Sequence, residues 1–286
     1  MKMGLITSFD PWRAKLCSCP AKYSLSAYSG CGHGCLYCYA SSYIPDFSKP
    51  RKKKDFIKRL SKELIKLSPG AIITIANSSD PYQPIEKNSG LTRKIIHSLV
   101  NTDKLVILVT KSSLIVRDLA LIKDLSKAIV TFSITTLDNK LSKKLEPQAC
   151  LPKKRLNAVE SLSKYIPVAV RLDPLIYPVN TTELKKTIKA IAASGAKQLI
   201  TSTYKAKPDN FKRMALAFKE YAKLWNKLYN EQGQYIQGSR YLPLKLRQQL
   251  IETVREASLS EGLLFSSCRE GFTNLNTASC DGSSLF

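Results

Sequence analysis

The chain has 286 residues and is 44% hydrophobic and 23% charged, a balance that is ordinary for a folded globular protein and excludes a mainly disordered chain. It carries 45 Lys and Arg against 22 Asp and Glu, a formal net charge of +23 at pH 7. Because so large a charge repels itself, we expect a polyanionic partner, a nucleic acid, although a Lys-rich proteome would also give a basic surface. No segment resembles a signal peptide or a membrane span, so we expect a cytoplasmic protein without a membrane partner.

Short apolar runs alternate with amphipathic helices along the first two thirds of the chain. Strands are predicted at 23–29, 71–76, 105–110, 128–134, 168–172 and 197–201. Helices are predicted between them at 56–67, 91–100, 114–125, 152–165 and 183–193. This alternation predicts an α/β fold in which right-handed crossovers join parallel strands, as an open sheet or as a full or partial barrel.

The pattern changes beyond residue 207. An apolar stripe predicts one long helix over 211–225, and a second helix is expected at 244–258, before a tail from 260 to 286 that contains Gly, Ser and Cys. We therefore expect an N-terminal segment (1–22), a barrel (23–207), and a C-terminal helical extension with a Cys-containing tail (208–286).

Polar residues follow several predicted strands. In parallel α/β folds the chemistry lies at the C-terminal strand ends, although capping or solvated loop residues also occur there. The residues are Asn77, Ser78, Ser79, Asp80, Lys111, Ser112, Ser133, Thr135, Arg171, Asp173, Ser202 and Tyr204.

Three cysteines are clustered in Cys31-Gly-His-Gly-Cys35-Leu-Tyr-Cys38. Three thiolates can bind three irons of a four-iron cluster and leave the fourth iron open. A tetrahedral zinc ion would normally need a fourth ligand, and His33 does not have zinc-finger spacing. The spacing therefore favours an iron–sulfur cluster.

The Cys31-x3-Cys35-x2-Cys38 spacing, with Tyr37 before the last cysteine, resembles the signature of radical S-adenosylmethionine (SAM) enzymes. The longer string 28–40 is similar to the spore photoproduct lyase-like branch. Further matches lie at 79–86, 91–93, 110–112, 133–138, 145–147 and 155–156. The resemblance implies a partial (β/α)6 TIM-like barrel of the radical SAM type.

The same resemblance implies the chemistry. A reduced 4Fe-4S cluster would cleave S-adenosyl-L-methionine to a 5′-deoxyadenosyl radical, which would abstract hydrogen from a substrate. A reductase or a ferredoxin-type protein would be the electron donor. Cys31, Cys35 and Cys38 would hold the cluster, and Tyr37 and Tyr39 would flank it, where a ring can pack on adenine or order the substrate.

The resemblance also implies contacts to SAM. Ser78 and Ser79 would lie near its methionyl end, Lys111 at its carboxylate, Ser133 near its ribose, and Arg171 at its carboxylate or at a substrate anion. His33 would be a hydrogen-bonding neighbour of the cluster or, alternatively, a proton donor.

One residue departs from the spore photoproduct lyase pattern. In that family a hydrogen-donating cysteine occupies the position that corresponds to Asn77, and an amide cannot return a hydrogen atom to a carbon radical as a thiol can. Repair of that dimer is therefore not expected from this position. Cys150 could be a substitute donor or an idle thiol.

Four further cysteines flank the predicted barrel: Cys17, Cys19, Cys268 and Cys280. A disulfide framework is not expected in a reducing compartment. If the tail folds back beside the N-terminus, these residues could form a second metal site, for zinc or for another Fe-S cluster. The alternative is four separate reduced thiols.

A basic run at 49–54 follows the cysteine loop. Lys153, Lys154, Arg155, Lys205 and Lys207 also lie near predicted loop ends. Together they predict a nucleic-acid-facing rim, although such charges commonly form an ordinary solvated surface.

These features lead to one main hypothesis, a radical SAM enzyme acting on a nucleic acid in DNA lesion repair or RNA modification. The same chemistry on a protein, a peptide or a small molecule is the alternative. A metal-stabilised nucleic-acid-binding protein without catalysis is the alternative from another class.

Overall fold

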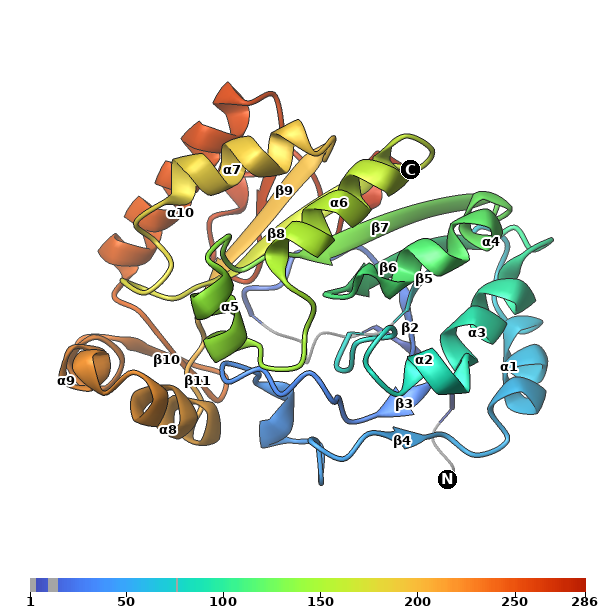
Figure 1. The fold of residues 1–286 in the computed structure, drawn as a ribbon, viewed down its shortest axis with the longest axis horizontal. Coiled ribbons are helices and arrows are strands. Elements are labelled where there is room, and N and C mark those ends of the chain that lie inside the picture. Colours follow the sequence, from blue (N-terminus) through green and yellow to red (C-terminus); the bar gives the residue numbers. More distant parts are fainter. Residues whose placement is uncertain (1–3, 10–14, 76) are drawn as a thin grey trace.

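The computed structural model describes residues 4–9, 15–75 and 77–286, which form an α/β fold around one large sheet (Figure 1). The strand order is β1-β2-β5-β6-β7-β8-β9-β12. The strands are β1 (Ile6–Ser8), β2 (Tyr23–Leu25), β5 (Ile72–Ile75), β6 (Leu105–Thr110), β7 (Lys127–Ser133), β8 (Val168–Leu175), β9 (Gln198–Thr203) and β12 (Leu264–Ser267). From β2 to β12 all neighbours pair in parallel, and β1 pairs antiparallel at one edge. Because β1 and β12 end the order, the described sheet is open and forms only part of a barrel.

Helices connect successive parallel strands and lie together along the sheet (Figure 1). They are α1 (Phe56–Leu64), α2 (Glu86–Ser89), α3 (Leu91–Leu99), α4 (Leu119–Lys123), α5 (Asn139–Leu145), α6 (Pro152–Ser163), α7 (Leu184–Ala193) and α10 (Leu244–Ser260). Their apolar positions are buried as the helical periodicity predicts, with Leu60, Ile95 and Ile96 each 0% exposed. Each such side chain stabilises the fold by roughly 1.5–3 kcal/mol relative to its exposed state. None of the described helices is long and apolar enough to cross a bilayer.

The six predicted strands are present, with one change at the first. The run predicted at 23–29 divides into β2 and β3 (Tyr28–Ser29), and β3 leaves the sheet to pair antiparallel with β4 (Arg51–Lys52). At the bend, Ser26 Oγ donates to Tyr28 O at 2.9 Å, a local bond that competes with continued sheet pairing. Ala76, the last residue of the predicted second strand, lies outside the described residues.

The prediction of one long helix over 211–225 is wrong. Helix α8 (Pro208–Ala217) ends at Phe218, which has φ −128° and ψ 64°, and is followed by a 3-10 turn (Lys219–Tyr221), α9 (Ala222–Trp225) and a π-helix (Asn226–Glu231). Phe218 is buried and packs edge-on against Trp225, with ring centroids 5.9 Å apart. The apolar residues of the stripe are thus buried by a bent chain rather than by one straight helix.

The C-terminal segment contributes two unpredicted features. A hairpin of β10 (Gln234–Ile236) and β11 (Ser239–Tyr241) turns at Gln237 and Gly238, whose φ angles of 44° and 76° suit a tight hairpin turn. Strand β12 adds a seventh parallel strand, and it pairs with β9 from Leu264 opposite Gln198 onward. Through β12, the tail is therefore part of the main sheet.

Candidate active site

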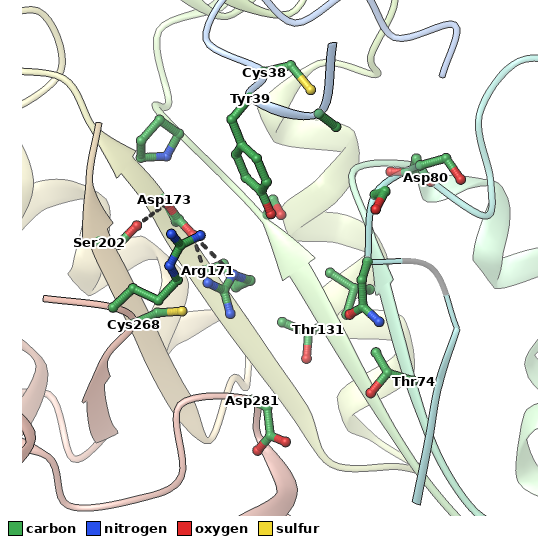
Figure 2. A pocket seen from close by; sticks show the side chains of 18 of the residues that line it. Cys38, Tyr39, Thr74, Asp80, Thr131, Arg171, Asp173, Ser202, Cys268 and Asp281 are labelled. Atoms are coloured by element: carbon green, nitrogen blue, oxygen red, sulfur yellow. Dashed lines mark hydrogen bonds and ion pairs between the residues drawn. The ribbon is translucent and has the colours of Figure 1, made fainter. Parts of the chain in front are cut away.

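A cavity of about 470 Å³ lies over the sheet, between the strands and the three-cysteine loop. Figure 2 shows Tyr39 descending from the loop towards the strand that carries Arg171 and Asp173, with Thr131 and Thr74 on the strands beyond. The residues predicted to bind the cluster, SAM or a second metal all line this one cavity: Cys31, Cys35, Cys38, Tyr37, Tyr39, Ser78, Ser79, Lys111, Ser133, Arg171, Cys17, Cys19, Cys268 and Cys280. Which of them touch a ligand stays a prediction, but the fold brings them together.

The three-cysteine loop is held by backbone contacts on two sides. Cys31 N donates to Phe47 O at 2.7 Å, and Gly30, at φ +80°, approaches the same carbonyl so closely that an added Cβ would lie 2.5 Å from it. On the other side, the Arg213 guanidinium of α8 donates to Leu36 O at 3.1 Å and to Cys38 O at 3.0 Å. The loop conformation is therefore fixed by the protein itself, as a metal-binding loop requires.

Asp80 lies beneath the loop as a buried carboxylate. It accepts hydrogen bonds from Thr110 Oγ1 at 2.7 Å and from Lys111 N at 2.6 Å, and its Oδ2 lies 3.2 Å from His33 Nε2. Burial acts to raise the pKa of Asp80, but His33 and these hydrogen bonds outweigh it and lower that pKa to about 2. The ionised Asp80 thus orients His33, which suits His33 as a neighbour that orders the loop.

Tyr37 joins the loop to a buried ion pair that the sequence did not reveal. Its hydroxyl donates to the Glu146 carboxylate, which also accepts from Thr135 Oγ1 at 2.7 Å and pairs with Arg155 Nη2 at 2.5 Å. Burial, followed by the charge on Glu146, raises the pKa of Tyr37 well above its ordinary value, so the phenol stays protonated. The family matches at 145–147 and 155–156 include Glu146 and Arg155, but they assign no role to either residue. The prediction of Arg155 on a basic rim is wrong, because this residue is 1% exposed.

Lys111 points into the enclosed region under the loop. Its Nζ lies 5.9 Å from the centre of the Tyr37 ring. Burial lowers the pKa of Lys111, but the negative groups around it, Cys35 first and then Glu146 and Asp80, raise it above its ordinary value. The side chain is therefore a cation on the cluster side of the cavity, the type of group that binds a carboxylate.

The two predicted serines after β5 have protein partners. Ser79 Oγ lies 2.9 Å from Ser26 Oγ and donates to Tyr28 O at 3.2 Å, and Ser78 Oγ lies 3.2 Å from Tyr43 Oη. These contacts join the segment after β5 to the chain on both sides of the three-cysteine loop.

The cavity floor contains two buried polar atoms that the sequence analysis missed. The hydroxyls of Thr74 on β5 and Thr131 on β7 have no hydrogen-bond partner among the described residues. Buried polar atoms are normally paired, so these two suit a polar ligand in the cavity. Together with three thiols and the Lys111 cation, they fit a cluster and SAM. No motif signals them, because threonines on buried strands are common.

Arg171 lines the cavity from β8, two strands away from β6, whose end carries Lys111. Its Nη2 pairs with Asp173 Oδ2 at 2.8 Å, while Asp173 Oδ1 accepts from Ser202 Oγ at 2.6 Å (Figure 2). The side chain also contacts Cys268. Because Asp173 already neutralises the guanidinium, Arg171 is less suited than Lys111 to bind a carboxylate.

Lys205 is also a paired cation. Its Nζ lies 2.9 Å from Glu270 Oε1, and the Lys205 side chain is 9% exposed. The prediction that it forms part of an exposed basic rim is therefore wrong.

Neither the position that holds the donor cysteine in spore photoproduct lyases, here Asn77, nor Cys150 presents a thiol to the cavity. Asn77 lines the cavity and donates from Nδ2 to Ser24 Oγ at 2.8 Å. Cys150 does not line the cavity; its Sγ donates to Lys111 O at 3.1 Å and accepts from Ser113 N at 3.3 Å.

Comparisons with known proteins agree with this geometry. Residues 25–191 match the family described as the radical SAM superfamily. An uncharacterised protein of Methanocaldococcus jannaschii is 34% identical over 148 residues, 50% of this chain and 55% of the relative. A protein of Acidianus two-tailed virus is 25% identical over 201 residues, 62% of this chain and 65% of the relative. The chain thus spans between about half and two thirds of the length of these curated relatives.

Solved structures share the fold at low sequence identity. Spore photoproduct lyase complexed with a dinucleoside spore photoproduct has a TM-score of 0.70 and 17% identity, covering 93% of this chain and 81% of that chain. SuiB of Streptococcus suis bound to S-adenosylmethionine has a TM-score of 0.58 and 12% identity, covering 90% and 53%.

Proposed function

Since the chain belongs to the radical SAM superfamily, we propose that Cys31, Cys35 and Cys38 bind a 4Fe-4S cluster, that SAM binds beside it, and that hydrogen is abstracted from a substrate in the cavity. Bound together, the two cofactors supply a 5′-deoxyadenosyl radical. The observation that carries the proposal is that the three thiols, the Lys111 cation and the unpaired Thr74 and Thr131 hydroxyls line the same cavity.

The protein would contribute binding, orientation and exclusion of water. We assign the SAM carboxylate to Lys111, since Arg171 is neutralised by Asp173. Ser78, Ser79 and Ser133 line the same cavity, where they would contact the methionyl and ribose groups. Tyr39, which is 38% exposed, would close the cavity over adenine or the substrate.

We propose a nucleic acid as the substrate, either in base-lesion repair or in RNA modification. The net charge of +23 supports a polyanion. Tyr39 and Tyr43, which are 38% and 37% exposed, line the cavity and offer aromatic surface on which an unstacked base can rest. Spore photoproduct lyase, which shares the fold, has been solved with a dinucleoside lesion. The amide at Asn77 directs the proposal to a reaction that takes no hydrogen atom from a thiol at this position.

The setting follows from the same chemistry. The cluster would need a reductase or a ferredoxin-type electron donor. A cytoplasmic location would keep the cysteines reduced, and all eight are free thiols in the structure.

Anaerobic purification and reduction test the proposal. The parent protein should convert SAM to 5′-deoxyadenosine, and Cys35→Ala should abolish this product and lose about four irons per chain. Cys150→Ala is the matched control, because Cys150 lies outside the cavity lining, and it should keep both. A parent protein that binds iron but never cleaves SAM, or a Cys35→Ala variant with unchanged iron, would refute the proposal.

A further inference from the structure

The four remaining cysteines of the cavity lining lie together, away from the three-cysteine loop. Cys19 Sγ is 3.5 Å from Cys280 Sγ, and Cys17 Sγ accepts from Cys19 N at 3.5 Å. The Cys268 thiol interacts electrostatically with that of Cys280. Four thiols from the two ends of the chain thus form one contiguous group.

The fold creates this meeting through β12 and the tail. Strand β12 pairs with β9, and at its end Cys268 N donates to Thr201 O at 2.8 Å. The tail then returns across the sheet, where Gln198 Nε2 donates to Ser279 O at 2.7 Å. An ion pair between Lys22 and Asp281 fastens the N-terminal segment beside the tail. The sulfur contacts therefore rest on sheet pairing and on buried polar contacts.

The surroundings of the four thiols carry positive charge. Arg171 contacts Cys268, and its Nη1 donates to Cys280 O at 3.3 Å. The buried Nε of Arg269 has no hydrogen-bond partner among the described residues, and its guanidinium interacts electrostatically with Cys268 and Cys17. Four thiolates on a dipositive metal centre leave a net charge of about −2. Because Arg171 is already paired with Asp173, Arg269 is the cation that would offset part of that charge.

We infer that Cys17, Cys19, Cys268 and Cys280 hold a second metal centre with four thiolate ligands. Ligation by four thiolates suits both a zinc ion and an iron–sulfur cluster. With all four positions occupied by protein, the centre has no site open for SAM, so it is a structural or electron-transferring centre. It joins the N-terminal segment to the tail.

The four thiols do not form a closed metal site in this geometry. In the part of the chain that the structure describes, no three candidate ligands converge as they would around one metal ion. The same holds for Cys31, Cys35 and Cys38, so this spacing does not distinguish the two groups. Closure of the four thiols would accompany metal binding and the release of their protons.

The test uses a full-length variant that lacks the first cluster, Cys31→Ala/Cys35→Ala/Cys38→Ala, purified without oxygen after growth with iron and zinc. Any metal it retains cannot belong to the three-cysteine loop. We expect either about one zinc per chain without visible absorbance, or about four irons with sulfide and visible absorbance. Both results support a four-thiolate centre and identify the metal. The result does not depend on SAM cleavage by the parent protein, so failure of the proposed function would be seen separately.

A second substitution locates the metal. In the same background, Cys268→Ser or Cys17→Ser should remove it and make both chain ends sensitive to protease, whereas Cys150→Ala should retain it. The half-buried Cys17 provides the second variant should the Cys268 variant not fold, as judged by circular dichroism. A metal-free triple variant would overturn the inference. So would metal retained after Cys17→Ser, or a mass lower by about 2 Da from a Cys19–Cys280 disulfide.

Discussion

Glu146→Gln removes the charge that anchors the three-cysteine loop while keeping the shape of the side chain. The carboxylate is 1% exposed and pairs with Arg155 at 2.5 Å. In the variant, Arg155 remains buried without a counter-charge, and removing one partner of a buried pair costs about 3–5 kcal/mol. For a chain of 286 residues, about 2 °C is lost per kcal/mol, so the melting temperature should fall by roughly 6–10 °C.

The assay is thermal unfolding of the metal-free proteins, followed by circular dichroism. Glu160→Gln is the matched control, since Glu160 lies exposed on α6, and it should melt within about 1 °C of the parent. Adding Arg155→Met to Glu146→Gln removes the orphaned charge and should recover part of the loss. The assigned pairing would be refuted if Glu146→Gln had the melting temperature of the parent. It would also be refuted if the double variant lost the sum of the two single variants' decreases in melting temperature.

Three further predictions concern the ligand, the partner and the response to pH. Lys111→Met should weaken SAM binding about tenfold or more with iron content unchanged, because a charged hydrogen bond is lost, and anaerobic calorimetry measures this. Replacing the exposed Lys52 and the nearby Lys54 by Gln should reduce the log–log salt slope of single-strand binding by about 1.4, whereas changing two exposed lysines of α7 should not. Asp209 is partly exposed, and although burial acts to raise its pKa, two serine hydroxyls and Arg213 lower it from the ordinary 3.8 to about 2. The ionised Asp209 therefore stabilises the fold fully above about pH 4, and this stabilisation is lost as the pH falls towards 2. The difference in melting temperature between the parent and Asp209→Asn should shrink over that range. Solvent screening keeps this difference below about 1 kcal/mol.

The five strands β5, β6, β7, β8 and β9 could be predicted because each is a largely buried apolar run between amphipathic helices, which is a local pattern. The break at Phe218 could not, because the apolar spacing continues through it. Whether the helix continues or breaks there depends on the packing of Phe218 against Trp225. These two residues belong to the same apolar stripe in a straight helix and in a broken one. Local periodicity reports which residues are buried, but not whether one straight helix buries them.

The site divides in the same way. The three cysteines are close in sequence, so their spacing alone indicated a cluster. Arg155 and Lys205 were predicted as surface charges, because charge in a sequence carries no information about burial. Their partners, Glu146 and Glu270, lie 9 and 65 residues away. A buried cation is recognised only when the fold brings its carboxylate to it.

The missed strand and the undecided cysteines have one physical cause. The run that forms β12 follows Gly262, but its two serines and its length of four residues do not distinguish a strand from a tail. It is a strand because β9 offers an open parallel edge, a property of the assembled sheet. Once β12 pairs there, Cys268 must lie at the C-terminal end of the sheet, beside Arg171 on β8, and the tail carries Cys280 to Cys19. The position of one short strand therefore determines whether four scattered thiols remain independent or form a site.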